Sequence, residues 1–147
     1  MQPDNAREGN SQQRHLTLWI LWGAFLVNIA LFAVLAALVG PSPASLPYNR
    51  VLVIALTALG TFTALVSIFL RQKMVARAIE QQRPQAISSA YILAFALCEA
   101  AALCGLLLRF TTSDPYYYFL FLIALVGFML NMPRRGDLLN AANGKRI

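Results

Sequence analysis

Charged residues are scarce in this sequence. Only 12% of its 147 residues are Asp, Glu, Lys or Arg, whereas 59% are hydrophobic. Soluble domains carry about 25% charged and roughly 45–50% apolar residues, and a soluble chain of this size would have to expose much of its apolar excess to water. The shortage of charge therefore excludes an ordinary soluble domain and predicts a membrane protein.

Cysteine and histidine are also rare. The two cysteines, Cys98 and Cys104, lie within one apolar run and face different directions on a helix, which excludes a secreted disulfide scaffold and a bond between them. With His15 as the single histidine, the sequence has no metal-ligand cluster, no Ser-His-Asp set and no phosphate-binding glycine loop. We therefore expect no enzymatic activity, no cofactor and no bound metal.

What the sequence has is long apolar runs. Four of them are predicted to be helices that cross a membrane, because lipid offers the backbone no hydrogen-bond partner and four strands could not close a barrel. About 20 helical residues cross a hydrocarbon core of about 30 Å. The expected spans are residues 16–39, 51–70, 87–108 and 116–132. The predicted fold class is an all-α integral membrane bundle of four transmembrane helices, with the lipid bilayer as its partner.

The segments between the spans are polar or rich in proline. Residues 1–15 should form a flexible tail, residues 40–47 a loop broken by three prolines, and residues 133–147 a second tail. Helix formers follow Arg71, so the second helix should continue past the lipid until Pro84 stops it. A cleaved signal peptide is the alternative for the first span, which exceeds the usual length of roughly 7–15 residues and precedes no A-x-A site.

The distribution of the net charge of +6 predicts the orientation. Ten cations fall in the two tails and the second loop, and two fall on the other side. Short basic segments stay in the cytoplasm, so both termini should be cytoplasmic in a bacterial-type inner membrane. The charges form no basic surface, and nucleic acid is not an expected partner. The ten are Arg7, Arg14, Arg71, Lys73, Arg77, Arg83, Arg134, Arg135, Lys145 and Arg146, and the two are Arg50 and Arg109.

One acidic residue, Glu99, lies near the middle of the third span. An ionisable residue at the centre of a membrane helix costs roughly 2.5–3.5 kcal/mol, and a low dielectric disfavours the charged form of a carboxyl. We therefore expect a protonated Glu99 that can release its proton inside the membrane. The alternative is structural, because a neutral carboxyl can also hydrogen-bond a neighbouring helix.

Depth along the helices suggests polar partners for Glu99. Asn28 lies as far into the first span as Glu99 lies into the third, and odd-numbered helices run in the same direction. Thr57 and Thr61 lie one turn apart in the middle of the second span. We predict that Asn28, Thr57 and Thr61 form polar support around Glu99.

Small residues recur on the third span at spacings of four, three and four. Such a stripe lets another helix approach closely, so helix packing is its expected role. The same stripe could pack against other membrane subunits or a second copy of this chain. The stripe consists of Ala94, Cys98, Ala101 and Gly105.

Residues 74–107 resemble a known family. The segment from Met74 to Gln85 is a polar loop with Arg, Gln and Pro, and Tyr91–Leu107 contains the carboxylate followed by small residues and Gly-Leu-Leu. This stretch is similar to the loop and carboxylate helix of the proteolipid, or c, subunit of rotary ATP synthases, and the rest of the chain is unmatched. The resemblance implies that Glu99 corresponds to the proton- or sodium-carrying carboxylate, and Arg83-Pro84 to the loop.

Two functions follow as hypotheses. In the first, the protein handles protons or cations through Glu99. In the second, it is a structural or accessory subunit that packs against a larger membrane complex through the small-residue stripe.

Overall fold

The computed structural model describes residues 3–39, 49–81, 83–112, 115–134 and 136, and these residues form helices and no strand. The predicted all-α fold is thus confirmed. The elements are α1 (Pro3–Leu38), α2 (Arg50–Glu80), α3 (Pro84–Thr112), the 3₁₀ helix η1 (Pro115–Tyr117) and α4 (Tyr118–Leu130). The expected loop at 40–47 and the tail beyond residue 136 lie outside the described residues.

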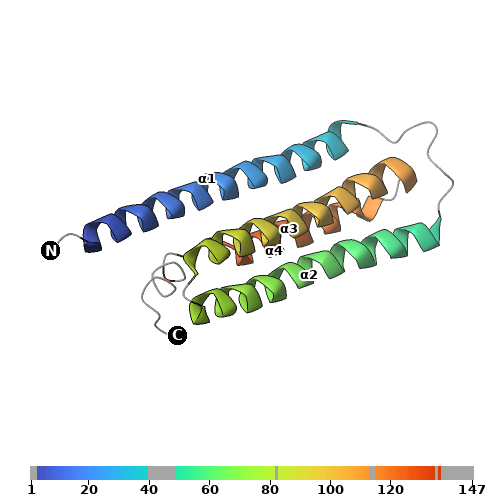
Figure 1. The fold of residues 1–147 in the computed structure, drawn as a ribbon. Helices are drawn as coiled ribbons and strands as arrows, with labels where there is room; N and C mark the ends of the chain where they lie inside the picture. Colours follow the sequence, from blue (N-terminus) through green and yellow to red (C-terminus); the bar gives the residue numbers. More distant parts are fainter. Residues whose placement is uncertain (1–2, 40–48, 82, 113–114, 135, 137–147) are drawn as a thin grey trace.

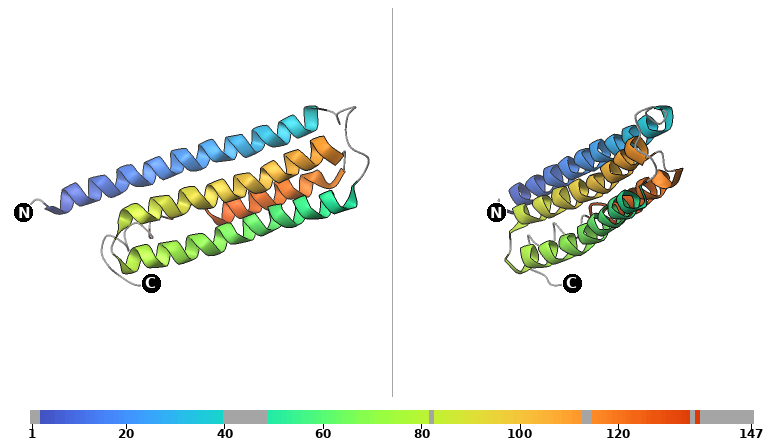
Figure 2. Two further views of the ribbon diagram at one scale, coloured as in Figure 1. Left: turned by 45° about the vertical axis from the view of Figure 1, so that its right-hand side comes forward. Right: turned by 90° about the vertical axis from the view of Figure 1, so that its right-hand side faces the viewer.

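The helices form an antiparallel bundle in which α3 packs against all the others (Figure 1). α1 and α2 lie on different sides of α3 and make no contact with each other along their described lengths. α4 packs against α3 and α2 and touches α1 (Figure 2). Three helices are long and apolar enough to cross a membrane, over His15–Leu38, Arg50–Glu80 and Gln85–Thr112. These helices indicate a membrane protein.

Local sequence explains the boundaries of α2 and α3. The Asn49 side chain caps α2 by accepting from the backbone N–H groups of Val51 (3.1 Å) and Leu52 (3.3 Å). α2 ends at Glu80, and Pro84 takes the first position of α3, where its missing N–H costs nothing. The connection between α2 and α3 is therefore very short, and it fixes how the two helices align.

The N-terminal segment differs from the prediction of a flexible tail over residues 1–15. α1 begins at Pro3, and its first turns extend past the N-terminal end of α3 (Figure 2). The costly step in helix formation is the first turn, and the apolar span already supplies a stable helix. Polar residues without an internal proline then extend that helix at little cost.

The fourth helix is shorter than the predicted span of residues 116–132. α4 has 13 residues, which cover about 20 Å, and with η1 the helical segment covers about 25 Å. The helix stops because the Asn131 side chain donates to the Gly127 carbonyl (2.9 Å) and Pro133 disfavours helical backbone at the residue before it. α4 alone does not reach across a hydrocarbon core of about 30 Å.

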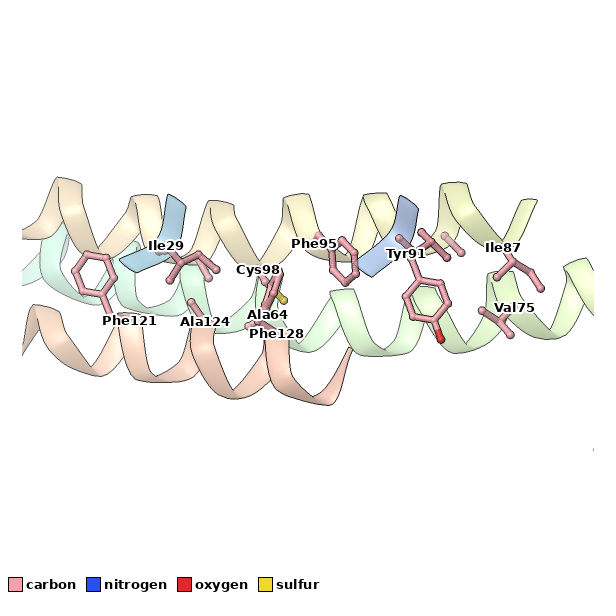
Figure 3. Packing of buried hydrophobic residues seen from close by; sticks show 14 of the residues in the cluster. Ile29, Ala64, Val75, Ile87, Tyr91, Phe95, Cys98, Phe121, Ala124 and Phe128 are labelled. Atoms are coloured by element: carbon pink, nitrogen blue, oxygen red, sulfur yellow. The ribbon is translucent and has the colours of Figure 1, made fainter. Parts of the chain in front are cut away.

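Aromatic rings fill the centre of the bundle (Figure 3). Phe95 of α3 and Phe128 of α4 are fully buried with ring centroids 5.0 Å apart. Trp22 of α1 stacks on Phe128 at 5.6 Å, and Phe25 lies 5.9 Å from Phe95. These contacts hold α1 to the other helices and align it parallel to α3.

Gly105 marks a close approach between α3 and the start of the last segment. A Cβ atom there would lie 3.1 Å from the Leu120 Cβ and 3.3 Å from the Tyr117 carbonyl oxygen, neither of which is a flexible chain end. We expect Gly105→Leu to reduce the free energy of unfolding by about 1–3 kcal/mol through overpacking, measured by denaturant titration in detergent. Gly23→Leu is the matched control, because nothing lies within 4 Å of that position. Equal effects of the two substitutions would contradict this prediction.

Candidate functional site

The structure brings Asn28 and Glu99 together at the seam between α1 and α3. The Asn28 Nδ2 donates a hydrogen bond to the Glu99 Oε1. Both residues are half-buried, so the pair lies at the edge of the helix interface rather than in the closed core. The contact that depth along the helices predicts is therefore present.

This contact forms because α1 and α3 run parallel and keep the same alignment along their lengths. One turn before it, Phe25 packs against Phe95, and near the other end of α1 the Arg109 Nε donates to the Ala36 carbonyl at 3.1 Å. Because both helices rise equally per residue, these two contacts bring Asn28 to the level of Glu99. The position of the Asn28–Glu99 pair is therefore set by the Phe25–Phe95 ring contact before it and by the Arg109–Ala36 hydrogen bond after it.

The Glu99 carboxyl has a neutral hydrogen-bond partner. The Asn28 amide is the one polar partner of Glu99 within the described chain, and it donates to Oε1. A neutral amide donor stabilises a carboxyl without supplying a positive charge, and no described residue donates to Oε2. No described Lys or Arg forms an ion pair with Glu99. The Glu99 carboxyl is therefore held by one neutral donor and by no salt bridge among the described residues.

Thr57 and Thr61 do not support Glu99 as predicted. Both lie on α2, which does not contact α1 along the described residues. Ser67 lies opposite Cys98 and Gly60 opposite Cys104, so the level of Glu99 on α2 is near Leu65. Thr61 is then about one turn away along α2, and Thr57 about two turns. The prediction placed the middle of the apolar run of α2 at the level of Glu99. In the structure, the short connection near Gln81 sets how α2 aligns with α3.

The small-residue stripe packs inside the bundle. Its members Ala94, Cys98 and Ala101 are buried, and so is Gly105. Cys98 contacts α2 through the Ser67 hydroxyl at 3.3 Å, and Gly105 meets the last segment at Leu120. These contacts place the stripe in the helix packing of the bundle. α2 and α4 cover the stripe within the described bundle.

Sequence reasoning missed a buried polar cluster between α2, α3 and α4. The Asn131 Nδ2 donates to the Ser67 Oγ at 3.0 Å and lies 3.5 Å from the Cys98 Sγ. The same nitrogen donates to the Gly127 carbonyl, which fixes the amide orientation because a carbonyl oxygen only accepts. The Asn131 Oδ1 is left buried without a partner. The signal was present, since Asn131 lies inside the predicted fourth span.

Each end of α3 has an arginine over a tyrosine ring. The Arg71 Cζ lies 5.6 Å from the Tyr91 ring centroid, and the Arg109 Cζ lies 5.0 Å from that of Tyr117. Tyr91 and Arg109 are separated by about 27 Å along α3, close to the thickness of a hydrocarbon core. The two cation–π pairs thus mark levels that suit the two membrane surfaces, with Glu99 between them.

The described residues contain no group of three His, Cys, Asp or Glu side chains that could hold a metal ion. The candidate site is therefore the Asn28–Glu99 pair. No family model, curated protein sequence or solved structure matches this chain.

Proposed function

We propose that the protein handles protons within a membrane, with Glu99 as the group that binds and releases them. One observation carries this proposal: a half-buried carboxyl lies midway along an apolar helix, with a neutral amide as its hydrogen-bond partner. Ionisable groups at such depth are expensive and are typical of ion pathways. The resemblance of residues 74–107 to the proteolipid subunit family supports the same role.

A proton fits the site better than a metal cation. Metal cations such as Ca²⁺ or Mg²⁺ take about six or more oxygen ligands. Asn28 presents its nitrogen to Glu99, and the described chain holds no acidic cluster nearby. The site as built therefore supplies one carboxyl, which is enough to carry one proton.

We propose a multi-pass protein of an inner membrane with both termini in the cytoplasm. The ten-to-two distribution of cations supports this orientation. The antiparallel bundle supports it too, because the start of α1 and the end of α4 lie toward the same end (Figure 1). The segment from η1 to α4 would be the fourth span, with the local bilayer thinned by a few Å to match its length.

Labelling with a hydrophobic carbodiimide tests the proton-binding group directly, because the reagent attacks protonated carboxyls in apolar surroundings. We expect slow labelling of Glu99 in membranes, identified by mass spectrometry of the peptide, with a rate that falls as the pH rises. Asn28→Leu removes the hydrogen-bond donor and should change that pH dependence. Unlabelled Glu99 at every pH would contradict the proposal and favour a structural or accessory role.

A further inference from the structure

Arg71 is the first cation after the apolar run of α2, and its guanidinium is incompletely satisfied. The residue is half-buried, yet its Nη1 atom is fully buried and has no hydrogen-bond partner. Burying a charged donor without an acceptor costs far more than burying an apolar group. This nitrogen therefore requires an acceptor that the described chain does not supply.

Arg109 shows the contrasting case at the other end of α3. Each guanidinium lies over a tyrosine ring, so the two arginines have similar surroundings. Arg109 donates from Nε to the Ala36 carbonyl at 3.1 Å, whereas among the described residues Arg71 has the Tyr91 ring as its partner and no hydrogen bond. Arg109 is thus tied to the bundle by a hydrogen bond, whereas no described residue accepts a hydrogen bond from the half-buried Arg71.

The C-terminal end of α4 lies near the Arg71–Tyr91 pair. Tyr91 lies beyond the last turn of α4, between α2 and α3 (Figure 3). The chain after α4 passes this point, where the Arg134 backbone N–H donates to the Tyr91 hydroxyl at 3.3 Å. Arg134 and Lys73 are exposed. These two residues add positive charge at the same end of the bundle as Arg71, although the Lys73 ammonium itself lies over the Phe69 ring on another face of α2. Positive charge at this level favours an anion over water as the missing acceptor.

We propose that Arg71 binds a phosphate group, and that an anionic lipid headgroup supplies it. The planar guanidinium matches phosphate oxygens through paired hydrogen bonds. Arg71 ends the apolar run of α2, so it lies at the level where hydrocarbon meets headgroups. Exposed basic residues beside a membrane helix attract anionic lipids, and Lys73 and Arg134 are exposed cations at this end of the bundle. This site is separate from Glu99, and it stands whether or not Glu99 carries protons.

The test measures the thermal unfolding of the full-length protein in a neutral detergent with three separate additions: phosphatidylglycerol, phosphatidylcholine and inorganic phosphate. A ligand that binds the folded state raises the unfolding temperature. We expect phosphatidylglycerol to raise it and the other two to have little effect. Arg71→Gln should weaken the apparent affinity for phosphatidylglycerol at least about tenfold, whereas Arg77→Gln, an equal loss of charge at an exposed position of α2, should not.

Arg71→Lys keeps the positive charge but loses the planar guanidinium. Its apparent affinity for phosphatidylglycerol should lie between those of Arg71→Gln and Arg77→Gln. If Arg71→Gln fails to fold, Arg71→Lys takes its place in the comparison with Arg77→Gln. Equal losses in the Arg71 and Arg77 variants would overturn the site in favour of diffuse surface attraction. Stabilisation by inorganic phosphate alone, or equal stabilisation by both lipids, would overturn the assignment to an anionic headgroup.

Discussion

Glu99→Gln is expected to reduce proton flux in liposomes to the rate of protein-free vesicles. Gln cannot be protonated and deprotonated at neutral pH, but its carbonyl oxygen still accepts from Asn28 as the Glu99 Oε1 does. The bundle should therefore persist, since hydrogen bonds between membrane helices contribute only about 0.6 kcal/mol on average. The measurement is the decay of an imposed pH gradient, followed with an entrapped fluorescent dye.

Two variants separate chemistry from structure in that experiment. Glu80→Gln makes the same chemical change at an exposed position at the end of α2, and flux should be unchanged. Glu99→Asp keeps a carboxyl on a shorter side chain and should retain part of the flux. If wild-type vesicles conduct no faster than empty ones, or if Glu99→Gln conducts as well as the wild type, the proposed function is wrong.

The contact between Asn28 and Glu99 could be predicted because depth follows from counting residues. Two parallel helices with the same rise stay aligned over their whole length, and α1 and α3 do so from Phe25 to Ala36. The helices could also be predicted, because an apolar run of about 20 residues in lipid must form its backbone hydrogen bonds within itself. Equal depth and helix formation need no knowledge of how each helix is rotated, whereas the contact also requires both side chains to face the seam.

Alignment between antiparallel helices could not be predicted from the apolar runs alone. The level of Thr57 and Thr61 depends on where α2 turns into α3, and that turn lies well past the end of the apolar run, at Glu80 and Pro84. The cluster of Ser67 and Asn131 was missed for a related reason. Each residue alone resembles an ordinary packing contact, and only the rotation of α2 and α4 shows that they meet.

Phe128 joins three helices, and its loss should have the largest effect on stability. The ring is fully buried on α4 and packs against Phe95 of α3 and Trp22 of α1. Phe→Ala in a soluble core costs about 3–5 kcal/mol. In lipid, the ring of the separated helix remains solvated by hydrocarbon, so packing and cavity effects dominate. We therefore expect Phe128→Ala to lower the free energy of unfolding by about 3 kcal/mol, the low end of that range.

The matched control is Phe62→Ala on α2, where the phenylalanine is 64% exposed and removing its ring leaves no cavity. Its effect should stay within about 0.5 kcal/mol. Both variants are measured by denaturant unfolding in the same detergent.

Because Trp22 and Phe25 hold α1 against the bundle through Phe128 and Phe95, Phe128→Ala should also loosen the seam that holds Asn28 to Glu99. Carbodiimide labelling of Glu99 should then become faster in Phe128→Ala and stay unchanged in Phe62→Ala. Equal stability of the two variants would show that the aromatic cluster does not hold α1 in place.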